Sequence, residues 1–221
     1  MKKPKIFIAC DTTNLTKVKQ IIKQSKTNKI KIGYKFGLEF INSKKGRQFI
    51  STLKKKIIFI DLKLNDTVNT MVSAVKALKD LKIHYLTVHI SSGLTALKAV
   101  KKVSGFTKIV GVTTLTSLND KDLKLIGYNK SVKNLVSHQA KLATKADLDA
   151  LVCSPYEANA VRKFFKKEII TPGVQIGKRN FDQKRSMEAK KVESDWLVIG
   201  RAITARGNIK KNIQNLAKEL K

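Results

Sequence analysis

The chain has 221 residues, 42% of them hydrophobic, which is enough for one large core. No stretch approaches the roughly 18 uncharged apolar residues of a membrane span, and Asp11 interrupts the apolar start after five apolar residues, too early for a secretory signal. We therefore expect a single domain over residues 1–221, located in the cytoplasm and without membrane contact.

The net charge of +30 suggests a nucleic-acid-binding protein, because a basic surface attracts the phosphate backbone. Of the 46 basic residues, however, 40 are lysine and 6 are arginine, and they are spread along the chain without interleaved aromatic residues. No zinc-finger or RRM signature is present, and Cys10 and Cys153 are isolated cysteines without histidines spaced as metal ligands. We expect solvated lysines, reduced structural thiols and no specific nucleic-acid partner.

Eight runs rich in β-branched residues recur along the chain and predict strands. They cover residues 5–10, 29–35, 56–64, 84–90, 108–115, 150–154, 168–174 and 195–203. Segments with helical spacing lie between most of them, at residues 14–25, 66–81, 93–103, 131–146, 157–165 and 208–221. This alternation indicates a parallel sheet with helical crossovers, and the continuous apolar strands indicate that both of its faces are covered.

Eight strand and helix units predict a single-domain (β/α)8 TIM barrel. The alternative is an open doubly wound sheet, which is disfavoured because no G-x-G-x-x-G follows the first strand. In a barrel, the chemistry lies where the strands end at the C-terminal rim. Polar residues, with some glycine and proline, stand at these strand ends: Asp11, Lys35, Asp61, Lys63, His89, Ser91, Ser92, Thr116, Ser117, Ser154, Pro172, Gly173, Gly200 and Arg201.

The third predicted strand, in IIFIDLKLND, ends in a group of charges. Asp61 and Lys63 are two residues apart, so on a strand they point to the same side and into the barrel mouth. A carboxylate beside an ammonium favours both charged forms, and a lysine held as a cation is a proton donor. The alternative for this pair is an ordinary surface ion pair, and the alternative for Asp66, beyond the strand, is a helix N-cap.

The loops after the seventh and eighth strands predict a phosphate site. Residues 171–185 form a long polar loop, and Gly200 and Arg201 close the eighth strand. Barrels often hold a phosphate at this place with backbone N–H groups at a glycine, aided by a guanidinium.

At these positions the sequence resembles the orotidine 5'-phosphate decarboxylase family, whose members make UMP in the last step of de novo pyrimidine synthesis. The resemblance covers essentially the whole chain. It is carried by the segments IACD, KIGYK, IDLKLNDTVNT, TVHISSG, GVTTLTS, VCS, TPGV, DQKR and IGRAIT. The D-x-K-x-x-D core is shared with related sugar-phosphate decarboxylases and formaldehyde-fixing synthases. The strand-end lysine, the N-T after the last aspartate, and the T-P-G, D-Q-x-R and G-R series are specific to the orotidylate branch.

The resemblance implies a charged network of Lys35, Asp61, Lys63 and Asp66, with Asp66 and Thr67 reaching in from the partner subunit of a homodimer. Lys63 would be the general acid that protonates C6 of the pyrimidine as carbon dioxide leaves. Asp61, together with the partner subunit's Asp66, would press against the departing carboxylate and position the lysines. Asp11 and Lys35 would hold the ribose hydroxyls.

The resemblance also implies the remaining substrate contacts, without a metal or an organic cofactor. Thr67 and Thr70 would line the shared site, Thr116 would contact the pyrimidine, and residues 175–187 would close as a lid. Gln183, Gly200 and Arg201 would grip the phosphate.

Two positions depart from the family pattern. Val68 stands where the family usually has proline, and we expect this change to alter only loop stiffness. Gln175, which we count among the substrate-binding residues, stands where the family usually has arginine. Lys178 or Arg179 is the expected compensation for a weakened phosphate or lid contact.

Two rival functions remain open from the sequence. The nearest is a magnesium-dependent decarboxylase or aldolase acting on a 3-keto or hexulose phosphate, since such relatives place an acidic residue where Lys35 lies. The other is a nucleic-acid-binding protein, whose specific binding should survive moderate salt.

Overall fold

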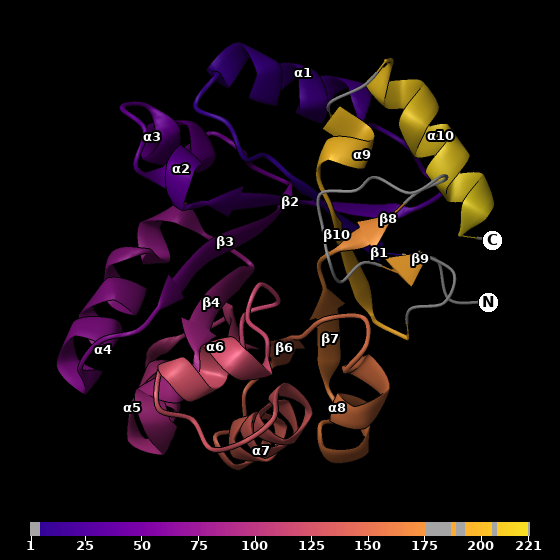
Figure 1. Ribbon diagram of the computed structural model, residues 1–221. Helices are drawn as coiled ribbons and strands as arrows, with labels where there is room; N and C mark the ends of the chain where they lie inside the picture. The colour runs from indigo at the N-terminus through magenta and orange to yellow at the C-terminus, as the bar shows by residue number, and fades with distance from the viewer. Residues whose placement is uncertain (1–4, 176–186, 189–192, 205–206, 221) are drawn as a thin grey trace.

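Eight parallel strands form the closed barrel at the centre of the molecule (Figure 1). The computed structural model describes residues 5–175, 187–188, 193–204 and 207–220. Around the barrel the strands are β1 (Lys5–Ala9), β2 (Lys31–Gly37), β3 (Ile57–Leu64), β4 (Tyr85–His89), β5 (Lys108–Val112), β6 (Ala150–Val152), β7 (Glu168–Thr171) and β10 (Trp196–Ile199). The predicted (β/α)8 barrel is confirmed, and the open doubly wound sheet is wrong because β1 pairs with β10 and closes the ring.

The helices surround this ring of strands (Figure 1). The six predicted helices are confirmed as α1 (Leu15–Gln24), α4 (Val68–Ala77), α5 (Gly93–Val103), α7 (Val132–Lys145), α8 (Ala158–Phe164) and α10 (Ile209–Glu219). Shorter elements are α2 (Leu38–Ile41), α3 (Gly46–Ser51), α6 (Asp120–Leu125), α9 (Arg201–Thr204), η1 (Lys79–Leu81), η2 (Ile90–Ser92) and the paired β8 (Val174–Gln175) and β9 (Met187–Glu188).

Local sequence fixes where several helices begin. The side chain of Asn14 accepts a hydrogen bond from the backbone N–H of Lys17 at the start of α1, and Ser131 and Asn208 act in the same way for α7 and α10. These N-caps satisfy backbone donors that have no partner within the helix. Among the described helices, none is long and apolar enough to cross a membrane.

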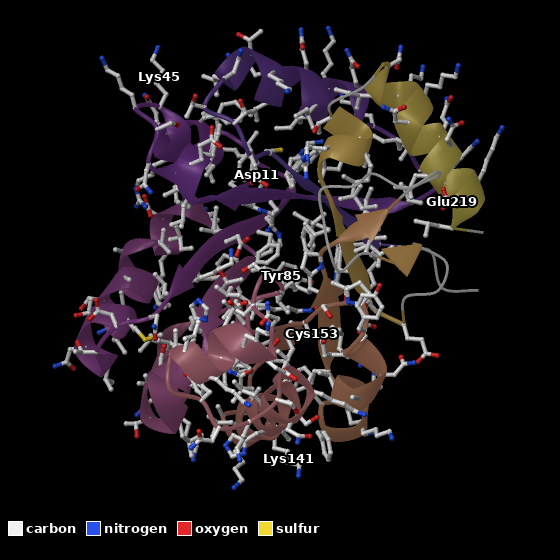
Figure 2. The ribbon with its side chains drawn as sticks, viewed as in Figure 1. Asp11, Lys45, Tyr85, Lys141, Cys153 and Glu219 are labelled. Atoms are coloured by element: carbon white, nitrogen blue, oxygen red, sulfur yellow. The ribbon has the colours of Figure 1, made fainter. Side chains whose placement is uncertain are left out.

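Two hydrophobic layers follow from the alternation of side chains along each strand. One layer packs the outer face of the strands against the helices. The other fills the barrel and consists of Phe7, Phe59, Tyr85, Val110, Ala150, Ile170 and Trp196. The rings of Phe7 and Trp196 stack with centroids 4.1 Å apart, and Tyr85 lies within the ring of strands (Figure 2).

The N-terminal end of the barrel is closed by a polar cluster around Glu168. Its carboxylate accepts hydrogen bonds from Lys108 Nζ at 2.8 Å, from the Tyr85 hydroxyl at 2.9 Å and from Lys5 Nζ at 3.4 Å. Burial would raise the pKa of Glu168, but the donors Lys108 and Tyr85 outweigh burial and lower it. The opposite end of the barrel, where the strands finish, carries the strand-end residues that the sequence singled out.

Replacing Phe7 with alanine should lower the free energy of unfolding by about 3–5 kcal/mol, because a fully buried ring is removed from the barrel interior. Urea unfolding measures the loss. The matched control is Phe106→Ala, since Phe106 is 64% exposed and its removal should change the stability by no more than about 0.5 kcal/mol. Equal losses for the two variants would contradict the assignment of the core.

Candidate active site

Four charged side chains meet at the C-terminal ends of β1, β2 and β3. Asp11 follows β1 by two residues, Lys35 lies in β2, and Asp61 and Lys63 lie in β3. The parallel register brings them together, since Ala9 pairs with Lys35 and Gly37 pairs with Asp61. The predicted convergence of these strand ends is therefore observed.

The four side chains form a chain of alternating charge. Lys35 Nζ lies 3.0 Å from Asp11 Oδ1 and 3.3 Å from Asp61 Oδ2. Lys63 Nζ lies 2.9 Å from Asp61 Oδ1. Each oxygen of the Asp61 carboxylate thus contacts a different lysine. The alternative of an ordinary surface ion pair is wrong, because the Asp61 side chain is only 13% exposed.

A distortion of β3 directs Lys63 towards Asp61. The pairing with β4 shifts between Ile60, which faces Leu86, and Leu64, which faces Val88, so three residues of β3 lie opposite one residue of β4. Lys63 within this bulge has φ 51°, in the left-handed region. Bulges near active sites re-aim side chains, whereas the sequence interpretation assumed a regular strand.

Thr87 of β4 supports the bulge. Its hydroxyl accepts the backbone N–H of Lys63 at 2.8 Å and donates to Asp61 Oδ1 at 3.1 Å. The side chain is fully buried, and leaving the Lys63 N–H without an acceptor would cost about 1–3 kcal/mol. Sequence reasoning missed Thr87, although a threonine within the apolar strand two residues before His89 was the available signal.

Electrostatic interactions keep Asp61 and Lys35 ionised although both are largely buried. Burial would raise the pKa of Asp61, but the ammonium groups of Lys35 and Lys63, with hydrogen bonds from Lys63 and Thr87, outweigh burial and lower it. Burial would likewise lower the pKa of Lys35, but the carboxylates of Asp61 and Asp11 raise it. Both groups are therefore charged throughout the neutral pH range.

His89 lies half-buried at the end of β4, where burial and then the nearby Lys63 lower its pKa. The imidazole is consequently neutral at neutral pH.

The two lysines differ in what they can do. Lys35 is 11% exposed and held between two carboxylates, whereas Lys63 is 34% exposed and, among the described residues, forms an ion pair with Asp61 only. An ammonium has three N–H donors. Lys63 is thus the lysine that combines a fixed position with access to the barrel mouth.

The segment after β3 lies on the exposed rim. Asp66 accepts a hydrogen bond from the backbone N–H of Thr67 at 2.6 Å, and the Thr67 and Thr70 hydroxyls lie 3.0 Å apart. All three residues are exposed. The alternative reading of Asp66 as a helix N-cap is wrong, because α4 begins at Val68 and its N-cap residue is Thr67. Val68 thereby occupies the first helical position, where a proline is also tolerated.

The other predicted contacts lie around the same rim. Thr116 is exposed in a turn, because β5 ends at Val112 rather than at residue 115 as predicted. Gly200 follows β10, and the exposed Arg201 begins α9. Gln183, Lys178, Arg179, the Gln175 side chain and most of the predicted lid, residues 175–187, lie outside the described residues.

Gly37 is a second residue of the site that sequence reasoning missed. A Cβ atom at this position would lie 3.2 Å from Asp11 Oδ1 and 3.6 Å from Lys35 Nζ. The absence of a side chain leaves room for this ion pair. Only the two-residue spacing from Lys35 could have drawn attention to it.

No group of three or more histidine, cysteine, aspartate or glutamate side chains suited to a metal ion occurs within the described part of the chain. The carboxylates of Asp11 and Asp61 are bridged by the ammonium of Lys35, which contacts both of them.

Comparison with known proteins places the chain in a family. A family model described as "Orotidine 5'-phosphate decarboxylase / HUMPS family" matches residues 4–216. The chain belongs to this family. The predicted family resemblance is therefore confirmed, and the match spans every strand of the barrel.

Two relatives in this family carry the name orotidine 5'-phosphate decarboxylase. The protein of Wolbachia pipientis subsp. Culex pipiens (strain wPip) is 38% identical over 224 residues, covering 97% of this chain and 98% of the relative. The protein of Buchnera aphidicola subsp. Schizaphis graminum (strain Sg) is 36% identical over 217 residues, covering 93% and 91%.

Solved structures of the family share the fold. The orotidine 5'-phosphate decarboxylase of Lactobacillus acidophilus superposes with a TM-score of 0.84 at 27% identity, covering 99% of each chain. The orotidine 5'-monophosphate decarboxylase of Methanocaldococcus jannaschii, in complex with the inhibitor BMP, has a TM-score of 0.80 at 21% identity, also covering 99% of each chain.

Replacing Lys35 with methionine should raise the pKa of Asp61, because one of the two ammonium groups that counteract the effect of burial is removed. In the wild type the lowered pKa means that Asp61 stabilises the fold above its unfolded pKa of about 4, and that this contribution is lost as the pH falls through the folded pKa. In the variant the loss begins at a higher pH. Carboxyl ¹³C NMR titration and urea unfolding at several pH values measure both effects.

The matched control is Lys133→Met on the exposed face of α7, which should leave the pKa of Asp61 unchanged. An identical Asp61 titration in Lys35→Met and the wild type would contradict the electrostatic description.

Proposed function

We propose that this protein decarboxylates orotidine 5'-phosphate to UMP and carbon dioxide, with Lys63 as the proton donor to C6. The observation that carries the proposal is the difference between the two lysines. Lys35 is buried between two carboxylates, whereas Lys63 is fixed by Asp61 and still reaches the mouth of the barrel.

The chemistry requires a cation at this point. When the C6–carboxylate bond breaks, carbon dioxide departs and the electron pair stays on C6, where the ring offers no good sink. An ammonium beside C6 stabilises that negative charge as it develops. Lys63 then transfers an N–H proton to C6, which completes UMP, and the neutral amine regains a proton from water.

Asp61 contributes through its fixed charge. Its carboxylate is held ionised by Lys35 and Lys63, and it would lie beside the position from which the substrate carboxylate departs. Loss of carbon dioxide removes one negative charge from this place. Asp61 therefore favours the transition state over the bound substrate while it holds Lys63 in position.

The rim supplies the remaining binding groups. Asp11 is 52% exposed and, with Lys35, would hold the ribose hydroxyls. Gly200 and Arg201 would bind the phosphate at the end of β10, the place where barrels commonly hold one. Energy from this remote phosphate can be used to organise the charged groups around C6.

We further propose a homodimer in which Asp66 and Thr67 of the partner subunit complete each site. Both residues are exposed on the rim, and within its own chain Asp66 makes no ion pair with Lys63 among the described contacts. A location in the cytoplasm, the absence of a specific nucleic-acid partner and the absence of membrane contact stay predictions.

Changing Lys63 to methionine should lower the decarboxylation rate at least about 10³-fold, because both the proton donor and the stabilising charge are lost. The fall in ultraviolet absorbance of orotidine 5'-phosphate follows the reaction. Lys133→Met, on the exposed face of α7, should retain the wild-type rate, because this lysine makes no ion pair with the charged groups of the site among the described contacts. Undiminished UMP formation by Lys63→Met would overturn the proposed role.

The same assay with EDTA separates the proposal from a magnesium-dependent reaction on a sugar phosphate. We expect the wild-type rate to survive chelation, because the charges of the proposed site come from lysine side chains. Loss of activity that added Mg²⁺ restores would favour the rival.

Mixing two inactive variants tests the shared site. Lys63→Met and Asp66→Asn dimers, exchanged in equal amounts, form heterodimers in which one site carries both substitutions and the other carries neither. We expect recovery of about a quarter of the wild-type activity. If Asp66 acted within its own chain, each heterodimer site would carry one substitution and no activity would return.

A further inference from the structure

Thr87 stands in the centre of β4 and faces the barrel interior. It alternates with Tyr85, a member of the interior core, and with His89 at the rim. Its side chain is fully buried. Thr87 therefore lies one step below the reactive end of the barrel, out of reach of solvent.

The Thr87 hydroxyl makes two hydrogen bonds that complement each other. It accepts the backbone N–H of Lys63 at 2.8 Å and donates to Asp61 Oδ1 at 3.1 Å. A hydroxyl has one proton to donate, so that proton is assigned to Asp61. The same carboxylate oxygen receives Lys63 Nζ at 2.9 Å.

These three contacts connect Lys63, Asp61 and Thr87 in a closed ring. The Thr87 hydroxyl holds the backbone N–H of Lys63, the Asp61 carboxylate holds the Lys63 ammonium, and the hydrogen bond from Thr87 to Asp61 links these two contacts. Because Lys63 lies in the bulge with φ 51°, its N–H is displaced from the regular pairing with β4. The side chain of Thr87 takes the place of a backbone acceptor.

We propose that Thr87 is a positioning residue for the reaction, which sets the orientation of Lys63 and the charge of Asp61 without contacting the substrate. This inference rests on the proposed function for its kinetic consequence. Its structural consequence, control of Asp61, holds for the ligand-free protein.

Packing alone would not require a hydroxyl at this place. Valine has nearly the shape of threonine and would fill the same space, whereas serine keeps the hydroxyl and lacks the methyl group. The pair Thr87→Val and Thr87→Ser therefore separates the hydrogen bonds from the volume of the side chain.

In ligand-free protein, ¹³C NMR titration should show a raised pKa of Asp61 in Thr87→Val and little change in Thr87→Ser. With orotidine 5'-phosphate, we expect kcat to fall about 10- to 100-fold in Thr87→Val, the usual range for a group that orients a reactive side chain. KM should change little, because the substrate contacts remain. Thr87→Ser should retain most of the wild-type kcat.

The control is Thr107→Val at the opposite end of the barrel, where a buried threonine hydroxyl donates to the carbonyl of Ile83. This variant should change thermal stability alone and leave the pKa of Asp61 and kcat unaltered. If Thr87→Val does not fold, Thr87→Ala removes the same hydroxyl and serves in its place.

The outcomes are distinct. An unchanged Asp61 titration with unchanged kcat in Thr87→Val, or an equal loss in Thr87→Ser and Thr87→Val, would overturn the inference. Failure of the proposed function would instead show as an inactive wild type, and the NMR titration would still decide whether Thr87 controls Asp61.

Discussion

The site depends on one carboxylate whose two oxygens are both engaged. Asp61 Oδ2 holds Lys35, and Oδ1 receives both Lys63 and the hydroxyl of Thr87. Three neighbouring strands are tied together by this group, since Lys35 lies in β2 and Thr87 in β4. A buried carboxylate normally resists ionisation, so Asp61 stays charged because these partners surround it, and its charge in turn fixes the position of both lysines.

The backbone of β3 is distorted to make this arrangement. A left-handed conformation costs a non-glycine residue about 1 kcal/mol or more, and Lys63 adopts it within a strand. A regular strand would pair Lys63 with β4 and fix its direction by the pleat. The bulge releases the residue from that constraint, and the surrounding barrel, closed and well packed, supplies the rigidity that maintains the strain.

The barrel was predictable because parallel strands covered on both faces appear in the sequence as short apolar runs. The convergence of Asp11, Lys35 and Asp61 was also predictable, since neighbouring strands end at one rim. The sequence indicated correctly that Asp61 and Lys63 meet, but it did not reveal the bulge of β3 between Ile60 and Leu64, within which both residues lie. Thr87 and Gly37 were missed because their roles depend on cross-strand register, which local patterns do not specify.

A cluster of one carboxylate and two lysines is not by itself a mark of reactivity, because this barrel has one at each end. Glu168 binds Lys5 and Lys108 at the N-terminal end, where Lys108 is 43% exposed, more than Lys63. What separates the two clusters is the backbone. Four non-glycine residues in the described chain have positive φ, and Lys55, Lys82 and Asp147 lie in connections, whereas Lys63 alone lies within a strand. The strained residue, Lys63, pairs with Asp61 at the C-terminal ends of the strands. This favours a reactive role for the Asp61 cluster and a structural role for the Glu168 cluster.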